Sequence, residues 1–174
     1  GVNCFYKIEH GTRYYYNIGT GDWSYCEATS RNICLDILRG EKLIWKNQGC
    51  SLIDLGDGIL NLEFHTKMNA IGGEVLEGIH KSIEIAEKDF KGLVIANDGA
   101  NFSAGANLAL VFMLAIEQEY DELDYAIRAF QNTNMRVRYS NIPVVVAPHG
   151  LTLGGGCEML LHADCTVASA ETYT

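Results

Sequence analysis

Hydrophobic positions along the chain separate residues 1–48 from residues 49–174. In the second part, apolar side chains recur with the periods of strands and helices, whereas the first part is aromatic, polar and irregular. The apolar runs Ser51–Leu55 and Ile59–Phe64 flank Gly56-Asp57-Gly58, and an Asp-Gly turn between such runs predicts a β-hairpin. The pattern therefore predicts an ordered domain that follows a shorter connecting segment.

Strands and helices alternate through the rest of that domain. Apolar side chains at helical spacing predict a helix over Gly73–Asp89, and the apolar run Gly92–Ala96 predicts a buried strand after it. The remaining predicted elements are a helical region from Leu108 to about Tyr139 with an acidic run that indicates a solvated face or a break, a strand over Val144–Val146, a helix that begins at Gly154-Gly155-Gly156, and a short strand over Cys165–Ala168. This alternation predicts an α/β layered fold.

Two polar, glycine-rich turns each follow a predicted strand and precede a predicted helix. They are Asn97–Asn107 and Pro148–Gly156, and open α/β sheets bind their ligands on this side. Backbone N–H groups at a helix N-terminus lack an intrahelical partner and lie at the positive end of the helix dipole, so glycines there can approach a developing negative charge. Glu158, one turn into the second helix, is the candidate carboxylate beside them.

Charge and composition exclude several classes of protein. The chain has 174 residues, 48% of them hydrophobic and 20% charged, which is typical of a globular domain. A formal net charge of −9 argues against non-specific binding to nucleic acid or to an anionic membrane. The sequence has no apolar run that could span a bilayer and no secretory pattern at its N-terminus. The tyrosines and tryptophans of residues 1–48 are therefore expected to bury against a neighbouring domain rather than to stack on bases.

Cysteine and histidine spacing gives no metal or disulfide framework. The six cysteines contain no Cys-x-x-Cys, and they are expected to be reduced thiols in a cytoplasmic protein. His65, His80 and His162 lack metal-ligand spacing to one another, so no metal site is predicted.

The glycine-rich turns could in principle hold a nucleotide phosphate or a single oxygen atom. Gly150–Glu158 has no Lys-Ser or Lys-Thr after its last glycine, and no Gly-x-Gly-x-x-Gly opens a helix elsewhere, which argues against nucleotide binding. The other possibility is one backbone amide from Ser103–Ala106 and one from Gly154–Gly156. Two amides that converge on one oxygen form an oxyanion hole, worth roughly 3 to 4 kcal/mol per donor to an enolate-like or tetrahedral transition state.

These residues resemble the motifs of a known family. Phe102-Ser103-Ala104-Gly105-Ala106-Asn107, followed after a helix by Pro143–Val146 and Gly150–Glu158, is similar to the enoyl-CoA hydratase/isomerase (crotonase) family, and His65–Ile71 resembles that family's first acyl-CoA loop. The resemblance covers about Cys50–Thr174. It implies a crotonase-like (ClpP/crotonase) α/β spiral of β-β-α units, truncated to the N-terminal part of the domain over residues 49–174. Within the family, the chain most resembles bacterial fusion enzymes in which a 3-hydroxyacyl-CoA dehydrogenase precedes the hydratase, so residues 1–48 are expected to be the tail of that dehydrogenase plus a connector.

The resemblance also implies roles for individual residues in fatty acid β-oxidation. The backbone N–H groups of Ala106 and Gly155 would hold a thioester carbonyl oxygen, and Glu158 would be one of two carboxylates that handle water and its protons. The residues implied in substrate and CoA binding are Lys67, Asn69, Ala104, Gly105 and Gly154. No cofactor is implied for this segment, because the acyl-CoA is the substrate and NAD would belong only to the dehydrogenase part. The family assembles into trimers, so a homo-oligomer is expected.

The second carboxylate of the hydratases would fall beyond Thr174. Because removal of one member of a cooperating pair costs more than its share, the 174-residue chain is expected to be inactive alone. The alternatives are a double-bond isomerase or a thioester hydrolase on the same oxyanion hole, or a non-catalytic piece whose exposed apolar half-core drives association. Without its flanking turns, Glu158 would be interpreted as an ordinary helix-surface glutamate.

Overall fold

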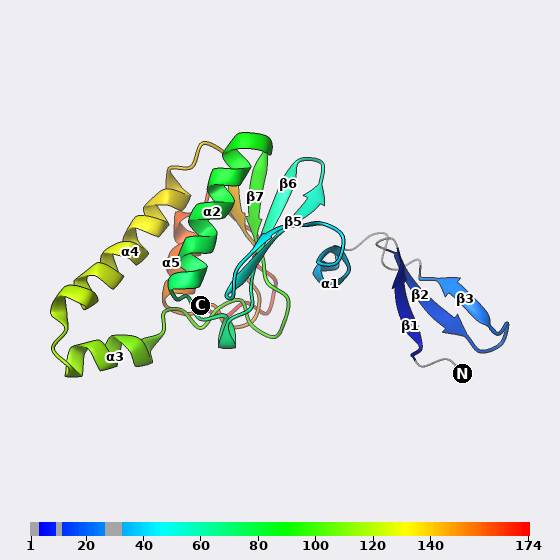
Figure 1. The fold of residues 1–174 in the computed structure, drawn as a ribbon, viewed down its shortest axis with the longest axis horizontal. Helices are drawn as coiled ribbons and strands as arrows, with labels where there is room; N and C mark the ends of the chain where they lie inside the picture. Colours follow the sequence, from blue (N-terminus) through cyan, green and yellow to red (C-terminus); the bar gives the residue numbers. More distant parts are fainter. Residues whose placement is uncertain (1–3, 10–11, 27–32) are drawn as a thin grey trace.

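A mixed six-stranded sheet forms the centre of the structure (Figure 1). The chain is described in a computed structural model over residues 4–9, 12–26 and 33–174. The strands lie side by side in chain order, as β4 (Leu43–Lys46), β5 (Cys50–Gly56), β6 (Ile59–Phe64), β7 (Gly92–Ile95), β8 (Val144–Val146) and β9 (Cys165–Thr166). The pairs from β4 to β6 are antiparallel and those from β6 to β9 are parallel. This architecture confirms the predicted α/β fold class.

The predicted hairpin joins β5 to β6. Asp57 and Gly58 at its tip have φ values of 56° and 83°. Both positive angles match the type I′ turn, whose twist suits a two-residue β-hairpin and which Asp-Gly favours. The Asp-Gly signal therefore located this turn correctly.

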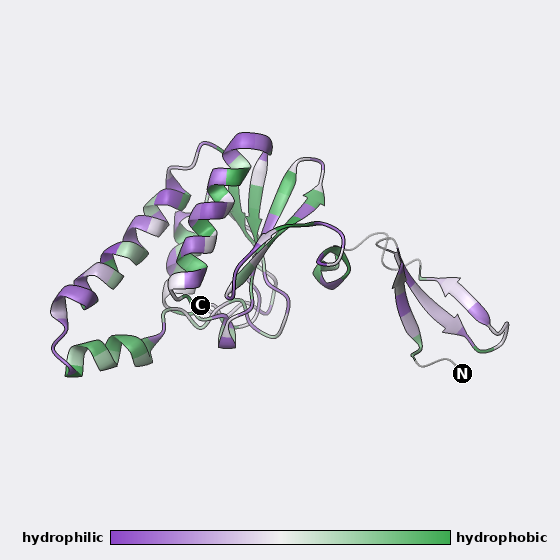
Figure 2. Cartoon of the chain, viewed as in Figure 1, coloured by the Kyte–Doolittle hydropathy of each residue, from purple (hydrophilic) through white to green (hydrophobic). Residues whose placement is uncertain are grey.

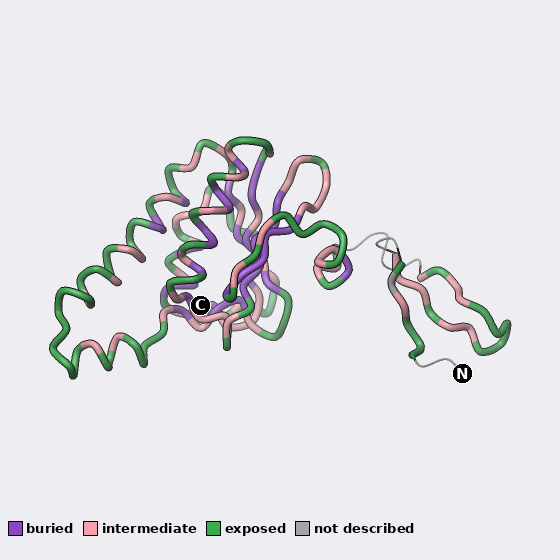
Figure 3. Tube along the Cα trace, in the orientation of Figure 1, coloured by how far each residue is buried: buried purple, intermediate pink, exposed green. Residues whose placement is uncertain are grey.

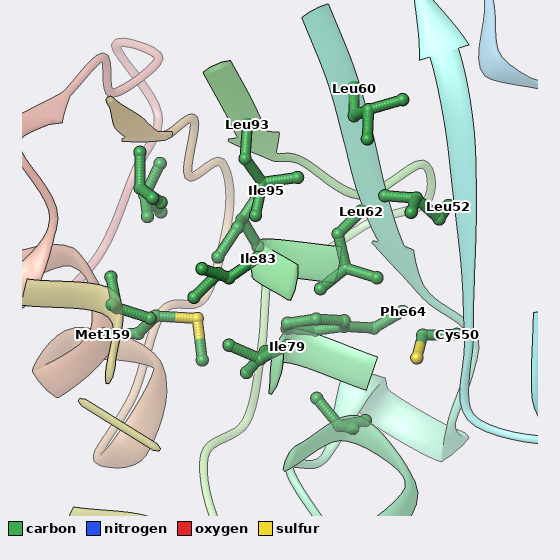
Figure 4. Packing of buried hydrophobic residues seen from close by; sticks show 14 of the residues in the cluster. Cys50, Leu52, Leu60, Leu62, Phe64, Ile79, Ile83, Leu93, Ile95 and Met159 are labelled. Carbon is green, nitrogen blue, oxygen red and sulfur yellow. The ribbon is translucent and has the colours of Figure 1, made fainter. Parts of the chain in front are cut away.

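Helix α2 (Gly73–Asp89) covers one face of the sheet, over the residues that its apolar stripe predicted. Phe64 from β6 and Ile79 and Ile83 from α2 pack together in the close view of the core (Figure 4). Met159 of α5 (Gly155–His162) reaches the same cluster from the other side. Because these side chains are all at most 2% exposed, the sheet, α2 and α5 share one dry core.

The predicted helical region breaks into two helices, α3 (Leu108–Ile116) and α4 (Tyr120–Arg138). Gln118 stands between them with φ of 59°, a left-handed conformation that no helix interior tolerates. The acidic run therefore marks a helix break followed by a solvated first turn of α4. Helix α3 is the most apolar helix of the chain in Figure 2, yet it contains no buried residue, as Figure 3 shows.

A row of short backbone β-bridges between loops lies beside the main sheet. After each parallel strand the chain forms a short parallel bridge with the next loop: Ile71 with Ala106, Ser103 with Thr152, and Leu151 with Tyr173. Each turn of the chain therefore contributes a strand to the sheet, a bridge to this row and then a helix. That repeat is the β-β-α spiral predicted for this fold.

Residues before 49 form a small sheet and also add a strand to the main one. Strands β1 (Tyr6–Glu9), β2 (Thr12–Asn17) and β3 (Asp22–Tyr25) make an antiparallel meander that lies beside the main body in Figure 1. Lys7 lies over the Trp23 ring, with its Nζ 4.8 Å from the ring centroid. After the short helix α1 (Leu35–Leu38), Arg39 pairs with Glu63 of β6, whose side chain is 2% exposed. The segment predicted as a connector is thus bonded to the domain predicted to begin at residue 49.

Glu87 of α2 clamps α4 through two bonds from Arg136, 2.9 and 2.5 Å long, and accepts a further bond from the Asn141 N–H. These bonds lower the pKa of Glu87 from 4.5 to about 2, and the hydrogen bond from Arg136 has a larger effect than the one from the Asn141 N–H. A carboxyl group with a depressed folded-state pKa contributes stability above its unfolded value of 4.5, and that contribution is lost as the pH falls toward 2.

Glu87→Gln is therefore expected to lower the free energy of unfolding by about 1–2 kcal/mol at neutral pH, because Gln cannot accept both charged bonds. The difference between wild type and variant should shrink as the pH falls from about 5 to about 3. Urea unfolding of both proteins across that range measures it. A difference that stays constant with pH would contradict the ion-pair assignment.

Candidate active site

Three loops meet at the carboxyl ends of the parallel strands. Ala104 donates its N–H to the Met68 carbonyl across 3.1 Å, and Ile71 donates to the Gly105 carbonyl across 2.8 Å. Ser103 donates to Leu151 across 3.1 Å and accepts from Leu153 across 2.9 Å. The loops after β6, β7 and β8 are therefore bonded to one another, on the side of the sheet where ligands were expected.

Gly105, the residue before the predicted donor Ala106, lies against the backbone of the other predicted donor, Gly155. A Cβ on Gly105 would lie 3.0 Å from the Gly155 nitrogen and 2.6 Å from the Leu153 oxygen, and its φ is +86°. Only glycine fits there, because both the close approach and the left-handed backbone exclude a side chain. Ala106 follows directly, and within the described part of the chain neither its N–H nor that of Gly155 has a hydrogen-bond acceptor.

The glycines at the start of α5 are fixed by packing from two directions. A Cβ on Gly155 would lie 2.3 Å from Cζ of Phe130, and a Cβ on Gly156 would lie 3.0 Å from the Ser103 Cβ. Gly154, the N-cap residue, has φ of 50°, and a Cβ there would meet no neighbouring atom within 4 Å. Gly154 therefore allows the turn before α5, whereas Gly155 and Gly156 allow the start of the helix to pack closely against its neighbours.

Glu158 lies in the first turn of α5, three residues after Gly155 and so on the same side of the helix. Its side chain is exposed, and its Oε2 accepts a 3.3 Å hydrogen bond from Nδ2 of the buried Asn134. A carboxylate is thus placed one helical turn from the Gly155 amide. Among the described residues, no histidine or second carboxylate bonds to this carboxylate; the His162 ring bonds instead to the Glu158 backbone carbonyl, across 2.7 Å.

The other predicted binding residues lie along the edge of the same loops. Asn69 has φ of 49°, donates its amide to the Asn101 carbonyl across 3.0 Å, and its own carbonyl accepts from the Ser103 hydroxyl. Ala104 is half-buried and bonds to the same loop, whereas Lys67 is exposed in a single 3₁₀ turn, Lys67–Asn69. The structure brings Asn69, Ala104 and Gly105 together and leaves the Lys67 side chain at the rim.

His65 begins the loop that follows β6. Its Nε2 lies 3.0 Å from the Ser51 hydroxyl, and burial, the largest effect, lowers its pKa below the usual value. The charge of Glu63 raises the pKa of His65, whereas the charges of Arg39 and Lys46 lower it further. The ring is therefore neutral near physiological pH and adds no positive charge to the loop.

Asn97 braces the loop that carries Ala106. Its Oδ1 accepts from the Phe64 N–H across 2.6 Å, and its Nδ2 donates to the Phe102 carbonyl across 2.7 Å, both in the protein interior. In the sequence this residue stood out only as the start of a polar loop. A polar residue directly after a buried strand was the available signal, since such a residue must find partners if it is buried.

Asn97→Ala is expected to destabilise the protein by about 2–4 kcal/mol, because two buried backbone groups lose their partner. Asn97→Asp keeps the acceptor for Phe64 but places a buried acceptor oxygen against the Phe102 carbonyl, so it should destabilise the protein at least as much as alanine does. Chemical denaturation of the three proteins measures the series. Equal stability of all three would show that the brace contributes nothing.

Among the residues that the structure describes, neither a metal cluster nor a membrane span is found. Over residues 4–9, 12–26 and 33–174, no three His, Cys, Asp or Glu side chains gather closely enough to hold an ion. In the same ranges, no helix combines the length and the apolarity needed to cross a bilayer.

Comparison with known proteins agrees with this geometry. Residues 54–173 match the family profile described as enoyl-CoA hydratase/isomerase. The solved enoyl-CoA hydratase from Thermoplasma volcanium superimposes with a TM-score of 0.63 at 26% sequence identity. The alignment covers 72% of this chain and 50% of that one, so the chain spans about half of that structure.

Two curated relatives extend far beyond the chain. A Bacillus subtilis protein named as a probable 3-hydroxyacyl-CoA dehydrogenase is 46% identical over 174 residues, which are 99% of this chain and 22% of the relative. A Rickettsia felis protein named as a fatty acid oxidation complex trifunctional enzyme is 30% identical over 154 residues, 88% of this chain and 21% of that protein. The chain therefore spans about a fifth of the length of these relatives.

Proposed function

Because the chain belongs to the enoyl-CoA hydratase/isomerase family, we propose that it forms the N-terminal part of a domain that adds water to trans-2-enoyl-CoA. The product would be a 3-hydroxyacyl-CoA. Support comes from the family and from one geometric observation. Gly105, the residue before Ala106, packs against the Gly155 nitrogen, and the N–H groups of Ala106 and Gly155 are unpaired within the described residues, with Glu158 one helical turn from Gly155.

In the proposed reaction, the two amides bind the thioester carbonyl oxygen of the substrate. The water oxygen forms a bond to C3 while it gives up a proton, and the C2=C3 π electrons shift to make an enolate. Negative charge develops on the carbonyl oxygen in the transition state that leads to the enolate, so two fixed N–H donors lower the barrier by about 3–4 kcal/mol each. A proton delivered to C2 then restores the thioester carbonyl.

Glu158 is proposed to orient the attacking water and to accept or return its proton. This role requires a group within hydrogen-bond reach of the water, and its place in the first turn of α5 supplies a carboxylate beside the amides. The second carboxylate that the family resemblance implies would be supplied by residues after Thr174.

We expect the isolated 174-residue chain to turn over crotonyl-CoA about 10³-fold more slowly than the full-length protein, because one member of the acid/base pair is lacking. Steady-state hydration assays of the two proteins, at matched folded concentration by circular dichroism, measure the ratio. Comparable turnover by the isolated chain would overturn the two-carboxylate mechanism.

The wider setting is also a proposal. The names of the two relatives support a role in fatty acid oxidation. We propose that NAD is bound only by a dehydrogenase domain that precedes this segment, as the family resemblance implies. A cytoplasmic location and a homo-oligomeric assembly would fit such an enzyme. Double-bond isomerisation, the alternative activity, would use the same two amides. Analysis of the products formed from 2-enoyl-CoA and from 3-enoyl-CoA separates hydration from isomerisation.

A second candidate function is association without catalysis, and helix α3 favours it. Five of its large apolar side chains are at least 50% exposed: Leu108, Leu110, Phe112, Met113 and Ile116. Contiguous exposed apolar surface of this kind marks an interaction site. If the isolated chain forms a defined oligomer by light scattering but binds no CoA thioester by calorimetry, association is the better description of this chain.

A further inference from the structure

Asn134 is the residue that holds the Glu158 side chain. Its Nδ2 donates to Oε2 of Glu158 across 3.3 Å, although Asn134 is only 3% exposed and Glu158 is exposed. Asparagine is mostly a surface residue, and burial of an amide costs free energy unless the amide is bonded. Core packing alone would favour an apolar side chain there. The hydrogen bond to the Glu158 carboxylate therefore accounts for a polar side chain at this buried position.

The same face of α4 also fixes the Gly155 amide. Phe130 and Asn134 are four residues apart and lie on one side of α4, as Gly155 and Glu158, three apart, do on α5. The ring of Phe130 lies so close to Gly155 that a Cβ would be 2.3 Å from Cζ. One helix face thus contacts both a proposed oxyanion donor and the proposed acid/base residue.

Helix α4 has its own anchors to α2. Thr133 bonds to His80 across 3.0 Å, and Arg136 bonds to Glu87. Thr133 donates its hydroxyl hydrogen to the Ala129 carbonyl, so it is the His80 Nε2–H that donates to Thr133. Because these contacts fix the position of α4, the Asn134 amide is available to position Glu158 rather than to hold the helix in place.

We propose that Asn134 is a positioning residue for the hydration reaction, which holds the Glu158 carboxylate beside the amides of Ala106 and Gly155. The bond engages one carboxylate oxygen and restricts the side-chain torsions, which leaves the other oxygen for the attacking water. This proposal rests on the proposed function, since it requires Glu158 to be the acid/base residue.

The test is a double-mutant cycle in the full-length protein with crotonyl-CoA, built from Asn134→Ala, Glu158→Gln and the double variant. Asn134→Ala is expected to lower kcat about 10- to 100-fold with KM changed less than about threefold, since loose placement of a catalytic group slows chemistry more than binding. In the Glu158→Gln background the same change should have almost no further effect on kcat, because the proton-transferring carboxylate that Asn134 positions has already been removed.

Asn132→Ala is the matched control. It removes the same side chain from the same helix at an exposed position, and it should leave kcat and KM unchanged. Asn134→Asp is the isosteric variant: it keeps the shape but replaces the donor by an acceptor, so its kcat should fall at least as far as that of the alanine variant. Thermal melts of all variants separate loss of fold from loss of positioning.

The outcomes are distinguishable. The positioning role is overturned if Asn134→Ala has wild-type kcat, or if it lowers kcat by the same factor in the wild-type and Glu158→Gln backgrounds. In either case Glu158→Gln still tests the proposed reaction. Wild-type kcat in Glu158→Gln overturns the proposed function itself. If Asn134→Ala lowers kcat in the wild-type background but not in the Glu158→Gln background, the result supports both the positioning role and the proposed function.

Discussion

Glu158→Gln in the full-length protein is expected to lower kcat for hydration of crotonyl-CoA about 10³-fold, within the range that general acid–base groups contribute. Glutamine keeps the shape and the bond-accepting oxygen of the side chain, so Asn134 can still donate to it. What is lost is the ability to accept and return a proton. KM should change little, because Glu158 is proposed to contact the water and not the thioester.

Glu122→Gln provides the control for that measurement. Glu122 also stands in the first turn of a helix, α4, and its side chain is exposed. Its substitution changes the net charge equally and should leave kcat unchanged. If Glu158→Gln and Glu122→Gln both retain wild-type turnover, Glu158 is a surface glutamate and the hydration mechanism is wrong.

Gly155→Ala is expected to lower kcat about 10²- to 10³-fold and to destabilise the protein by about 1–3 kcal/mol. The new methyl group would lie 2.3 Å from Cζ of Phe130, so the Phe130 ring or the start of α5 must shift. A shift of α5 displaces the Gly155 N–H from its place beside Gly105. Steady-state kinetics and urea unfolding measure the two effects separately.

Gly73→Ala is the matched control, since Gly73 is the first residue of α2 just as Gly155 is the first of α5. A Cβ on Gly73 would meet no atom within 4 Å, so alanine should be neutral or slightly stabilising. The double variant Gly155→Ala with Phe130→Leu relieves the clash and should recover part of both kcat and stability. A Gly155→Ala variant with normal kcat would exclude this amide as an oxyanion donor.

Local signals in the sequence predicted the elements of the domain well. The Asp57-Gly58 turn and the α2 stripe depend on neighbouring residues, and the structure has a hairpin and the helix Gly73–Asp89 there. The helix break at Gln118 was foreseen only as one of two options, because an acidic run is equally compatible with a solvated helix face.

Long-range partners were not predictable from the sequence. Residues 1–48 showed only aromatic and polar character, yet Arg39 pairs with a buried glutamate 24 residues later in the chain. Asn134 and Phe130 were also missed, because their importance lies in what they contact on α5 and not in any local motif. The family resemblance pointed to Ala106 and Gly155 as proposed backbone donors, but the side chains that pack against and around them could be identified only from the structure.

The most direct test of the central claim is the polarisation of the bound thioester carbonyl. In ¹³C NMR of an acyl-CoA labelled at that carbonyl carbon, binding to the full-length protein should move the resonance to higher frequency, because the amides of Ala106 and Gly155 withdraw charge through the oxygen. The shift should be reduced in Gly155→Ala and kept in Gly73→Ala. A bound carbonyl whose resonance equals that of free acyl-CoA in water would contradict the oxyanion hole formed by these two amides.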